Sequence, residues 1–235
     1  MSTMRNRPRI YFSFRSPYSW LAYRDLVDRY PQVATEAQWR PFWEPDPRTE
    51  AMLHAAGGSF PYVDMSRAKH FYVLVDVDRL RRERGLSITW PVDREPVWEV
   101  PHLAYLVAAD AGLGAQFIDR VYQARWSQGR DICAAATMAA VAGELGLPEK
   151  QVVGAADDDE MRGRGVKALL EVDRDGVFGV PFFVHGRHKF WGVDRLAAFV
   201  RSVTGEPPPS PVDGAPPLET EIRASADQGH AGGCG

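Results

Sequence analysis

A hydroxyl group and the start of a helix coincide near the beginning of the chain. Residues 9–14 are apolar and favour a β-strand, and Ser16 then precedes Pro17. Serine is a preferred N-cap, and proline at the first helical position loses no hydrogen bond that the helix needs. A hydroxyl at this place lies beside free backbone N–H groups, at the positive end of the helix dipole, which favours an anion. Ser16 is therefore the candidate catalytic residue, with a simple helix cap as the alternative.

A second stretch, near the end of the chain, has the complementary features. Residues 176–184 favour a strand that opens on Pro181, and a turn at 185–187 leads to a second strand at 188–191. A Val-Pro bond can be cis, and we predict that Val180–Pro181 is cis. A strand, Ser-Pro and a helix at the start, with Val-Pro, a hairpin and a helix at the end, outline a thioredoxin-type domain.

The elements between these stretches set the fold class. A helix at 17–29, which Pro31 ends, and a strand at 37–43 give a parallel βαβ unit with the first strand. From about residue 48 to 170 the apolar periodicity is helical, with predicted helices at 49–56, 65–84, 101–111, 115–128, 132–145, 149–155 and 159–173. We therefore predict an α/β fold: a thioredoxin-like domain (8–47 and 172–202) with an all-helical domain (48–171) inserted between its second and third strands. Residues 203–235 are rich in Pro and Gly and are typical of a mobile tail.

These motifs together resemble a known family. Segments 14–22, 126–132, 176–181 and 190–196 match the DsbA-like branch that contains the 2-hydroxychromene-2-carboxylate isomerases and the kappa-class glutathione transferases. The pattern Lys69, Tyr72, Asp76, Arg79 and Leu80 also fits, and the resemblance covers residues 8–202. It implies glutathione or another low-molecular-weight thiol as cofactor, and a homodimer.

The resemblance also implies roles for single residues. The thiol sulfur would lie beside Ser16, and the backbone of Val180, before Pro181, would pair with the cofactor backbone like an added strand. Val193 and Asp194 would receive its γ-glutamyl end, with Asp194 facing the ammonium group, and Lys69 would meet its glycyl carboxylate.

The expected substrate cavity is less defined by the sequence. Tyr18, Trp126 and Arg130 are its candidate residues, and ordinary packing is the alternative for each. We expect Trp191 to pack in the core at a strand end and His102 to be a partly exposed structural histidine.

Cysteine usage excludes one class of reaction. Dithiol oxidoreductases need two cysteines at the start of this helix, because a thiolate must attack a disulfide there. The chain has Ser16 and Ser19 instead, and its two cysteines, Cys133 and Cys234, are far apart. A serine can still donate a hydrogen bond to a thiolate and, with the helix dipole, lower the pKa of a thiol that a cofactor supplies.

Three functions fit these features. The first is a thiol-dependent isomerase that acts on a small molecule with a conjugated double bond, in the manner of a 2-hydroxychromene-2-carboxylate isomerase (cis-trans). The second is a kappa-class-like glutathione S-transferase, in which the adduct stays attached. The third is a non-catalytic binding or partner subunit, because residues 57–61 lack an asparagine that the family usually carries before the lysine.

Composition bounds the partners and the compartment. A net charge of −3 over 235 residues gives no argument for nucleic acid. No apolar run reaches membrane-spanning length, so we expect no membrane partner, and the absence of a signal-like start and of paired cysteines favours the cytoplasm. The acidic run 157–160 is typical of a solvated helix start, and we expect no metal site.

Overall fold

The computed structural model describes residues 7–61 and 65–207. In these residues one sheet has the strand order β2-β1-β3-β4. Its strands are β1 (Arg9–Phe12), β2 (Gln38–Pro41), β3 (Phe182–His185) and β4 (His188–Trp191). β1 pairs with β2 in parallel and with β3 antiparallel, and β3 and β4 form an antiparallel hairpin.

The first crossover contains two helices. α1 (Pro17–Arg29) follows β1, as its Ser-Pro start predicts, and α2 (Pro31–Glu36) lies between α1 and β2. The first helix ends before Pro31, as expected, and Pro31 is also the first residue of a second helix that the sequence did not predict. Proline suits both places, because it cannot continue a helix and is favoured at the first helical position.

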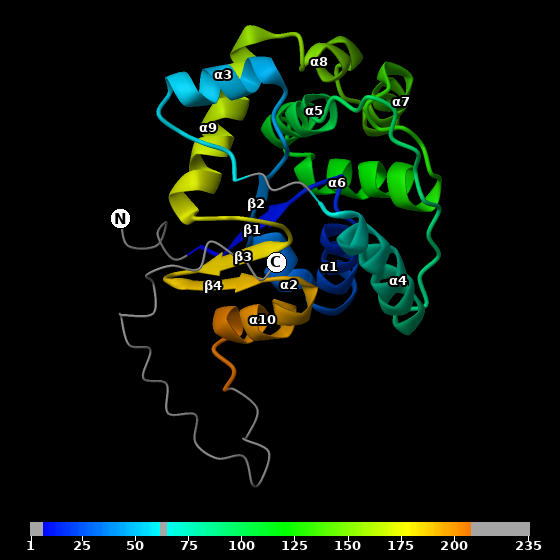
Figure 1. Ribbon diagram of the computed structural model, residues 1–235, viewed down its shortest axis with the longest axis vertical. Helices are drawn as coiled ribbons and strands as arrows, with labels where there is room; N and C mark the ends of the chain where they lie inside the picture. The colour runs from blue at the N-terminus through cyan, green and yellow to red at the C-terminus, as the bar shows by residue number, and fades with distance from the viewer. Residues whose placement is uncertain (1–6, 62–64, 208–235) are drawn as a thin grey trace, which may run out of the picture.

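The strands alternate between two covered faces. Ile10 and Phe183 form one apolar cluster with α1 and with α10 (Leu196–Thr204). Tyr11, on the other face, donates a hydrogen bond to Asp175 at the end of α9 (Asp159–Asp175). Figure 1 shows α9 on one side of the sheet and α10 with α2 on the other. The sheet is thus covered on both faces by helices, which explains its many buried aromatic residues.

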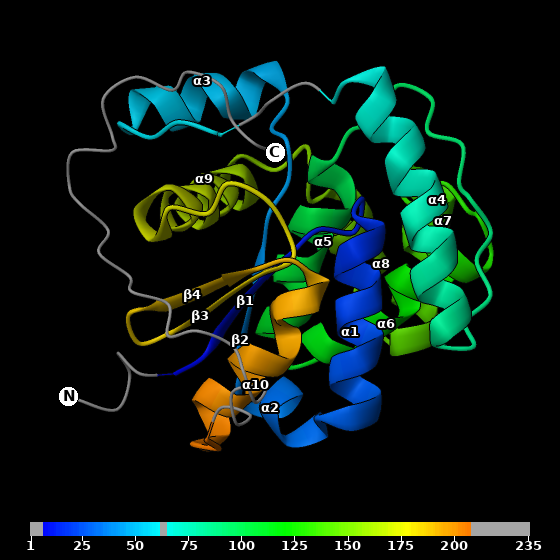
Figure 2. The same ribbon diagram turned by 60° about the horizontal axis from the view of Figure 1, so that its bottom comes forward.

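Helices fill the chain between β2 and β3 (Figure 2). They are α3 (Pro47–Ala55), α4 (Arg67–Glu83), α5 (Glu99–Asp110), α6 (Gly114–Tyr122), the π-helical turn η2 (Gln123–Ser127), α7 (Ala135–Leu145), α8 (Glu149–Gly154) and α9. The predicted fold class is therefore confirmed: an α/β thioredoxin-like fold with a helical insertion between its second and third strands. The division into folding units at residues 48 and 171 stays a prediction.

α4 differs from its predicted packing. Of its apolar residues Val77 is buried, but Phe71, Tyr72 and Val75 are 52%, 60% and 60% exposed. The helical spacing of apolar residues in this segment predicts one buried stripe that includes Phe71 and Val75, and for these two residues the prediction is wrong. Among the described residues, no helix is both long and apolar enough to cross a membrane. Most of the predicted tail (208–235) lies outside the described residues.

Candidate functional site

The turn between β1 and α1 holds Ser16 at the predicted helix N-cap. The backbone of Ser16 is extended, and its Oγ accepts a hydrogen bond from the N–H of Ser19 at 3.1 Å. The N–H of Ser16 itself donates to the carbonyl of Ser13 at 3.2 Å. The cap fixes the oxygen of Ser16 but leaves the direction of its proton open.

The Ser16 hydroxyl lies next to the second predicted stretch. Ser16 Oγ lies 3.5 Å from the carbonyl oxygen of Val180, and the Val180–Pro181 bond is cis, as predicted. Hydroxyl hydrogen bonds are most often 2.7–2.8 Å long, so this contact is weak. The hydroxyl is therefore free to turn toward a stronger acceptor at the same place.

A cavity of about 760 Å³ adjoins this contact; we call it the cis-proline cavity. It is lined from α1, α4 and the segment 180–195, and its walls include Tyr18, Asp76, Val180, Pro181, Val193 and Asp194. Ser16 borders it through Val180. Five of the residues predicted for the site thus line one cavity, and Ser16, which does not itself line the cavity, contacts its wall at Val180.

Tyr18 and Asp76 join α1 to α4 across this cavity. The Tyr18 hydroxyl donates to Asp76 Oδ2 at 2.9 Å, and Arg79 donates to Asp76 Oδ1 at 2.7 Å. Burial, followed by the hydrogen bond and the charge of Asp76, raises the pKa of Tyr18 well above its usual value. Tyr18 is therefore a neutral hydrogen-bond donor at any working pH.

The turn after β4 brings a carboxylate to the cavity. Val193–Arg195 is a 3-10 turn that leads into α10. Gly192 has φ +94°, and a Cβ atom there would lie 2.7 Å from Asp194 Oδ1. Because glycine has no Cβ, residue 192 leaves space for the Asp194 carboxylate to fold back over it. The Asp194 side chain is 69% exposed and forms an ion pair with Arg195.

Three predicted residues lie elsewhere. Lys69 is exposed in the first turn of α4, where its N–H donates to Ser66 Oγ, and within the described residues its side chain does not line the cis-proline cavity. Trp126 is buried in η2 and stacks on Trp20 with ring centroids 6.1 Å apart. Arg130 follows η2, and its N–H bonds to Ala124. The cofactor and substrate roles of these residues stay predictions.

Two residues differ from their expected places. Trp191 is 43% exposed and lines the cavity, whereas we expected it in the core. Its indole Nε1 lies 3.0 Å from the position of a Cβ on Gly179, so this glycine admits the ring beside the Val180 backbone. His102 is wholly buried, where partial exposure was expected.

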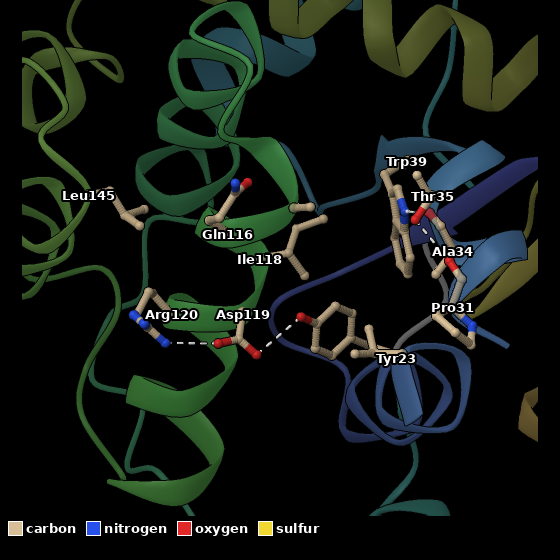
Figure 3. A pocket seen from close by; sticks show the side chains of 12 residues that line it. Tyr23, Pro31, Ala34, Thr35, Trp39, Gln116, Ile118, Asp119, Arg120 and Leu145 are labelled. Atoms are coloured by element: carbon tan, nitrogen blue, oxygen red, sulfur yellow. Dashed lines mark hydrogen bonds and ion pairs between the residues drawn. The ribbon is translucent and has the colours of Figure 1, made fainter. Parts of the chain in front are cut away.

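A second cavity, of about 510 Å³, lies along the other half of α1 (Figure 3). We call it the Tyr23 cavity. The Tyr23 hydroxyl donates to Asp119 at 3.1 Å, and Asp119 also pairs with Arg120. Trp39 also lines the Tyr23 cavity, and its indole N–H donates to the carbonyl of Ala34 at 2.9 Å. Tyr23, Asp119 and Arg120 are thus bound to one another, and Ser16, the catalytic candidate from the sequence, does not line this cavity.

The family follows from a comparison with known domains. The model of the DSBA-like thioredoxin domain matches residues 9–204. The chain belongs to this family. The serines at 16 and 19 therefore stand in a domain of DsbA type, where the sequence excludes dithiol exchange.

Individual relatives agree with the fold. The chain is 26% identical over 187 residues to a 2-hydroxychromene-2-carboxylate isomerase of Sphingobium xenophagum, covering 79% of this chain and 92% of that one. A solved 2-hydroxychromene-2-carboxylate isomerase aligns with a TM-score of 0.65 and 23% identity, over 84% of this chain and 94% of the other. The cytosolic disulfide reductase DsbM of Pseudomonas aeruginosa, solved with GSH, aligns with a TM-score of 0.55 and 18% identity, over 84% and 94%.

Proposed function

We propose that the protein is a thiol-dependent isomerase that acts on a conjugated double bond of a small molecule. The observation that carries the proposal is the weakly held hydroxyl of Ser16 at a helix N-cap, next to the carbonyl before the cis-proline and at the edge of a cavity. The relative named as a 2-hydroxychromene-2-carboxylate isomerase supports the reaction class.

Three features of the cavity support a thiol tripeptide such as glutathione as its ligand. Val180 lies before β3 begins, so its backbone is placed to pair with an extended ligand. Asp194 offers a carboxylate to an ammonium group. The carboxylate can fold back over Gly192 because this glycine has no Cβ. The volume of about 760 Å³ lies within the range of small-molecule sites.

Ser16 would hold the sulfur in its charged form. Its O–H can turn from the 3.5 Å contact with Val180 to a thiolate, and a hydrogen bond to a charged acceptor is the stronger one. The first N–H groups of α1 add the positive end of the helix dipole. Both effects lower a thiol pKa from about 8.5 and raise the fraction of thiolate at neutral pH.

A thiol held beside Ser16 would supply reversible addition to the conjugated double bond, the chemistry that allows rotation about that bond. Tyr18 is a neutral phenol in the cavity wall and is our candidate donor to the substrate. Its O–H, which donates to Asp76 in the structure, would turn to the substrate's carbonyl oxygen as negative charge develops there. Trp191 and Tyr72 offer exposed ring surface at the same cavity for an apolar substrate.

The experiment combines retention and turnover. The purified protein should be retained on immobilised glutathione, and with free glutathione it should convert a conjugated cis-enone to its trans isomer without consuming the thiol. Conversion at the same rate without any thiol would contradict the proposal. Accumulation of a stable thioether would instead favour the transferase, and neither binding nor turnover would favour a non-catalytic subunit.

We also propose, on the resemblance alone, that the protein is a cytoplasmic homodimer. Light scattering at micromolar concentration should give twice the chain mass of 26.2 kDa. A monomer mass would contradict the dimer, and fluorescence imaging of the tagged chain would test the compartment.

A further inference from the structure

His102 lies under the turn that carries Ser16, although the two residues belong to different parts of the fold. It comes from α5 in the helical insertion and is wholly buried. Its Nε2 accepts the N–H of Phe14 at 3.2 Å and lies 3.4 Å from Ser13 Oγ. Both partners are in the turn between β1 and α1, immediately before Ser16.

The hydrogen bonds define the state of the ring. His102 Nδ1 lies 2.7 Å from the carbonyl oxygen of Trp98, which can only accept, so the proton is on Nδ1 and Nε2 is the acceptor. Burial is the main cause that lowers the pKa of His102 to about 3, and the charge of Arg125 acts in the same direction. The imidazole is therefore neutral and serves as a fixed acceptor.

The turn also has a second contact with the helical insertion. The hydroxyl of Tyr122, at the end of α6, donates to the carbonyl of Ser13 at 3.1 Å. That carbonyl also accepts the N–H of Ser16. His102 and Tyr122 thus bind the two polar ends of one peptide group, the one that joins Ser13 to Phe14, from outside the thioredoxin-like part.

We propose that His102 is a positioning residue for Ser16: its Nε2 holds the Phe14 peptide so that the Ser16 hydroxyl keeps its place opposite Val180. The proposal rests on the proposed function for the role of the hydroxyl. It assigns the helical insertion a part in the thiol chemistry, beyond covering the sheet.

Two pairs of variants test the proposal. His102→Gln keeps an acceptor at the position of Nε2, whereas His102→Leu removes it and leaves the Phe14 N–H unpaired. Tyr122→Phe removes the second contact, and Tyr105→Phe is its control. The Tyr105 hydroxyl donates to the carbonyl of Trp39 in β2 and not to the turn, and the variant keeps the ring that packs against Phe14. If His102→Leu does not fold, the comparison of Tyr122→Phe with Tyr105→Phe still tests whether contacts from the helical insertion hold the turn that positions Ser16.

The readouts are backbone amide exchange at residues 14–16 and the pKa of a bound glutathione thiol. We expect His102→Leu and Tyr122→Phe to speed exchange at these amides about tenfold relative to Tyr105→Phe. The first variant removes the acceptor of the Phe14 N–H, and the second removes the Tyr122 hydroxyl that holds the Ser13 carbonyl, the acceptor of the Ser16 N–H. The thiol pKa should rise by about one unit, a tenfold shift of the equilibrium from thiolate to thiol. His102→Gln should recover most of both effects.

Several outcomes would overturn the proposal. One is a thiol pKa in His102→Leu and Tyr122→Phe equal to that of the wild type. Another is an equal change in Tyr105→Phe, because His102 would then contribute only to general stability. If wild-type protein binds no thiol, the proposed function fails, and unchanged exchange at residues 14–16 in the variants would separately refute the positioning role.

Discussion

The two cavities along α1 differ in how their polar groups are bound. In the Tyr23 cavity, Tyr23, Asp119 and Arg120 bind one another at 2.9–3.1 Å. In the cis-proline cavity Tyr18 and Asp76 form a similar pair, but the Ser16 hydroxyl has only a 3.5 Å contact. A cavity of suitable size is thus not enough to indicate a site; an available donor at its edge distinguishes the two.

The largest effect should come from the donor itself. Ser16→Ala should reduce thiol-dependent isomerisation at neutral pH by about a hundredfold, because one donor to a charged reacting group is lost. The free energy of unfolding should fall by about 1 kcal/mol, the usual cost of losing an N-cap. Steady-state rates and urea unfolding measure the two quantities.

Asp158→Ala is the matched control for Ser16→Ala, because Asp158 caps α9 in the same manner. It should lower stability by a similar amount and leave the rate unchanged. If Ser16→Ala loses stability as Asp158→Ala does and keeps full activity, Ser16 is only a cap.

The next effect compares the two tyrosines that pair with aspartates. Tyr18→Phe should reduce kcat/KM about tenfold, because the cis-proline cavity loses a neutral donor. Tyr23→Phe should leave kcat/KM unchanged, since it removes the corresponding group from the other cavity. Equal losses in both variants would show that the hydroxyl groups act through stability alone.

A smaller effect is expected for the carboxylates. Asp194→Asn should weaken glutathione binding about fivefold, about 1 kcal/mol. The effect is small because Asp194 is 69% exposed, and an exposed carboxylate contributes little to a charge pair with the ammonium group of the ligand. Asp119→Asn, in the Tyr23 cavity, should not change the Kd. Calorimetry on both variants makes the comparison, and a weaker Kd for Asp119→Asn would argue that the second cavity also takes the thiol.

The smallest effect concerns stability at high pH. Burial, then the charge and hydrogen bond of Asp119, raises the pKa of Tyr23 above its usual value of about 10. A raised pKa gives stability that is complete below pH 10 and is lost as pH rises, because only the unfolded phenol ionises. Tyr23→Phe should therefore lose stability less steeply than wild type above pH 10, as urea unfolding at several pH values will show. Parallel curves would contradict the pairing in the Tyr23 cavity.

Local rules predicted the parts of this site that depend on neighbouring residues. Ser16 and Pro17 mark a helix start in any context, and Pro181 with Gly186 marks a strand and a hairpin turn. The cis-proline cavity was less predictable. Asp76 entered only as part of a family pattern, although its spacing of four from Tyr72 places both on one face of α4.

Tertiary contacts decided where the structure places His102 and Trp191, which the sequence misplaced, and Trp126, which it left open. Nothing in the spacing of His102 distinguishes it from the other residues of a predicted helix. Only the position of α5 against the turn shows that it is buried. Trp191 is large and apolar, which favours the core, but Gly179 opens a place for its ring at the cavity. Trp126 is near the end of a predicted helix, and a π-helical turn directs it toward Trp20.

The most direct test of the account is the ultraviolet titration of the thiolate of bound glutathione in wild-type protein and in Ser16→Ala. We predict a pKa in the wild type well below the value of about 8.5 for a free thiol, and a pKa in Ser16→Ala that returns toward that value. Equal pKa values in the two proteins would contradict the claim that Ser16 holds the thiolate.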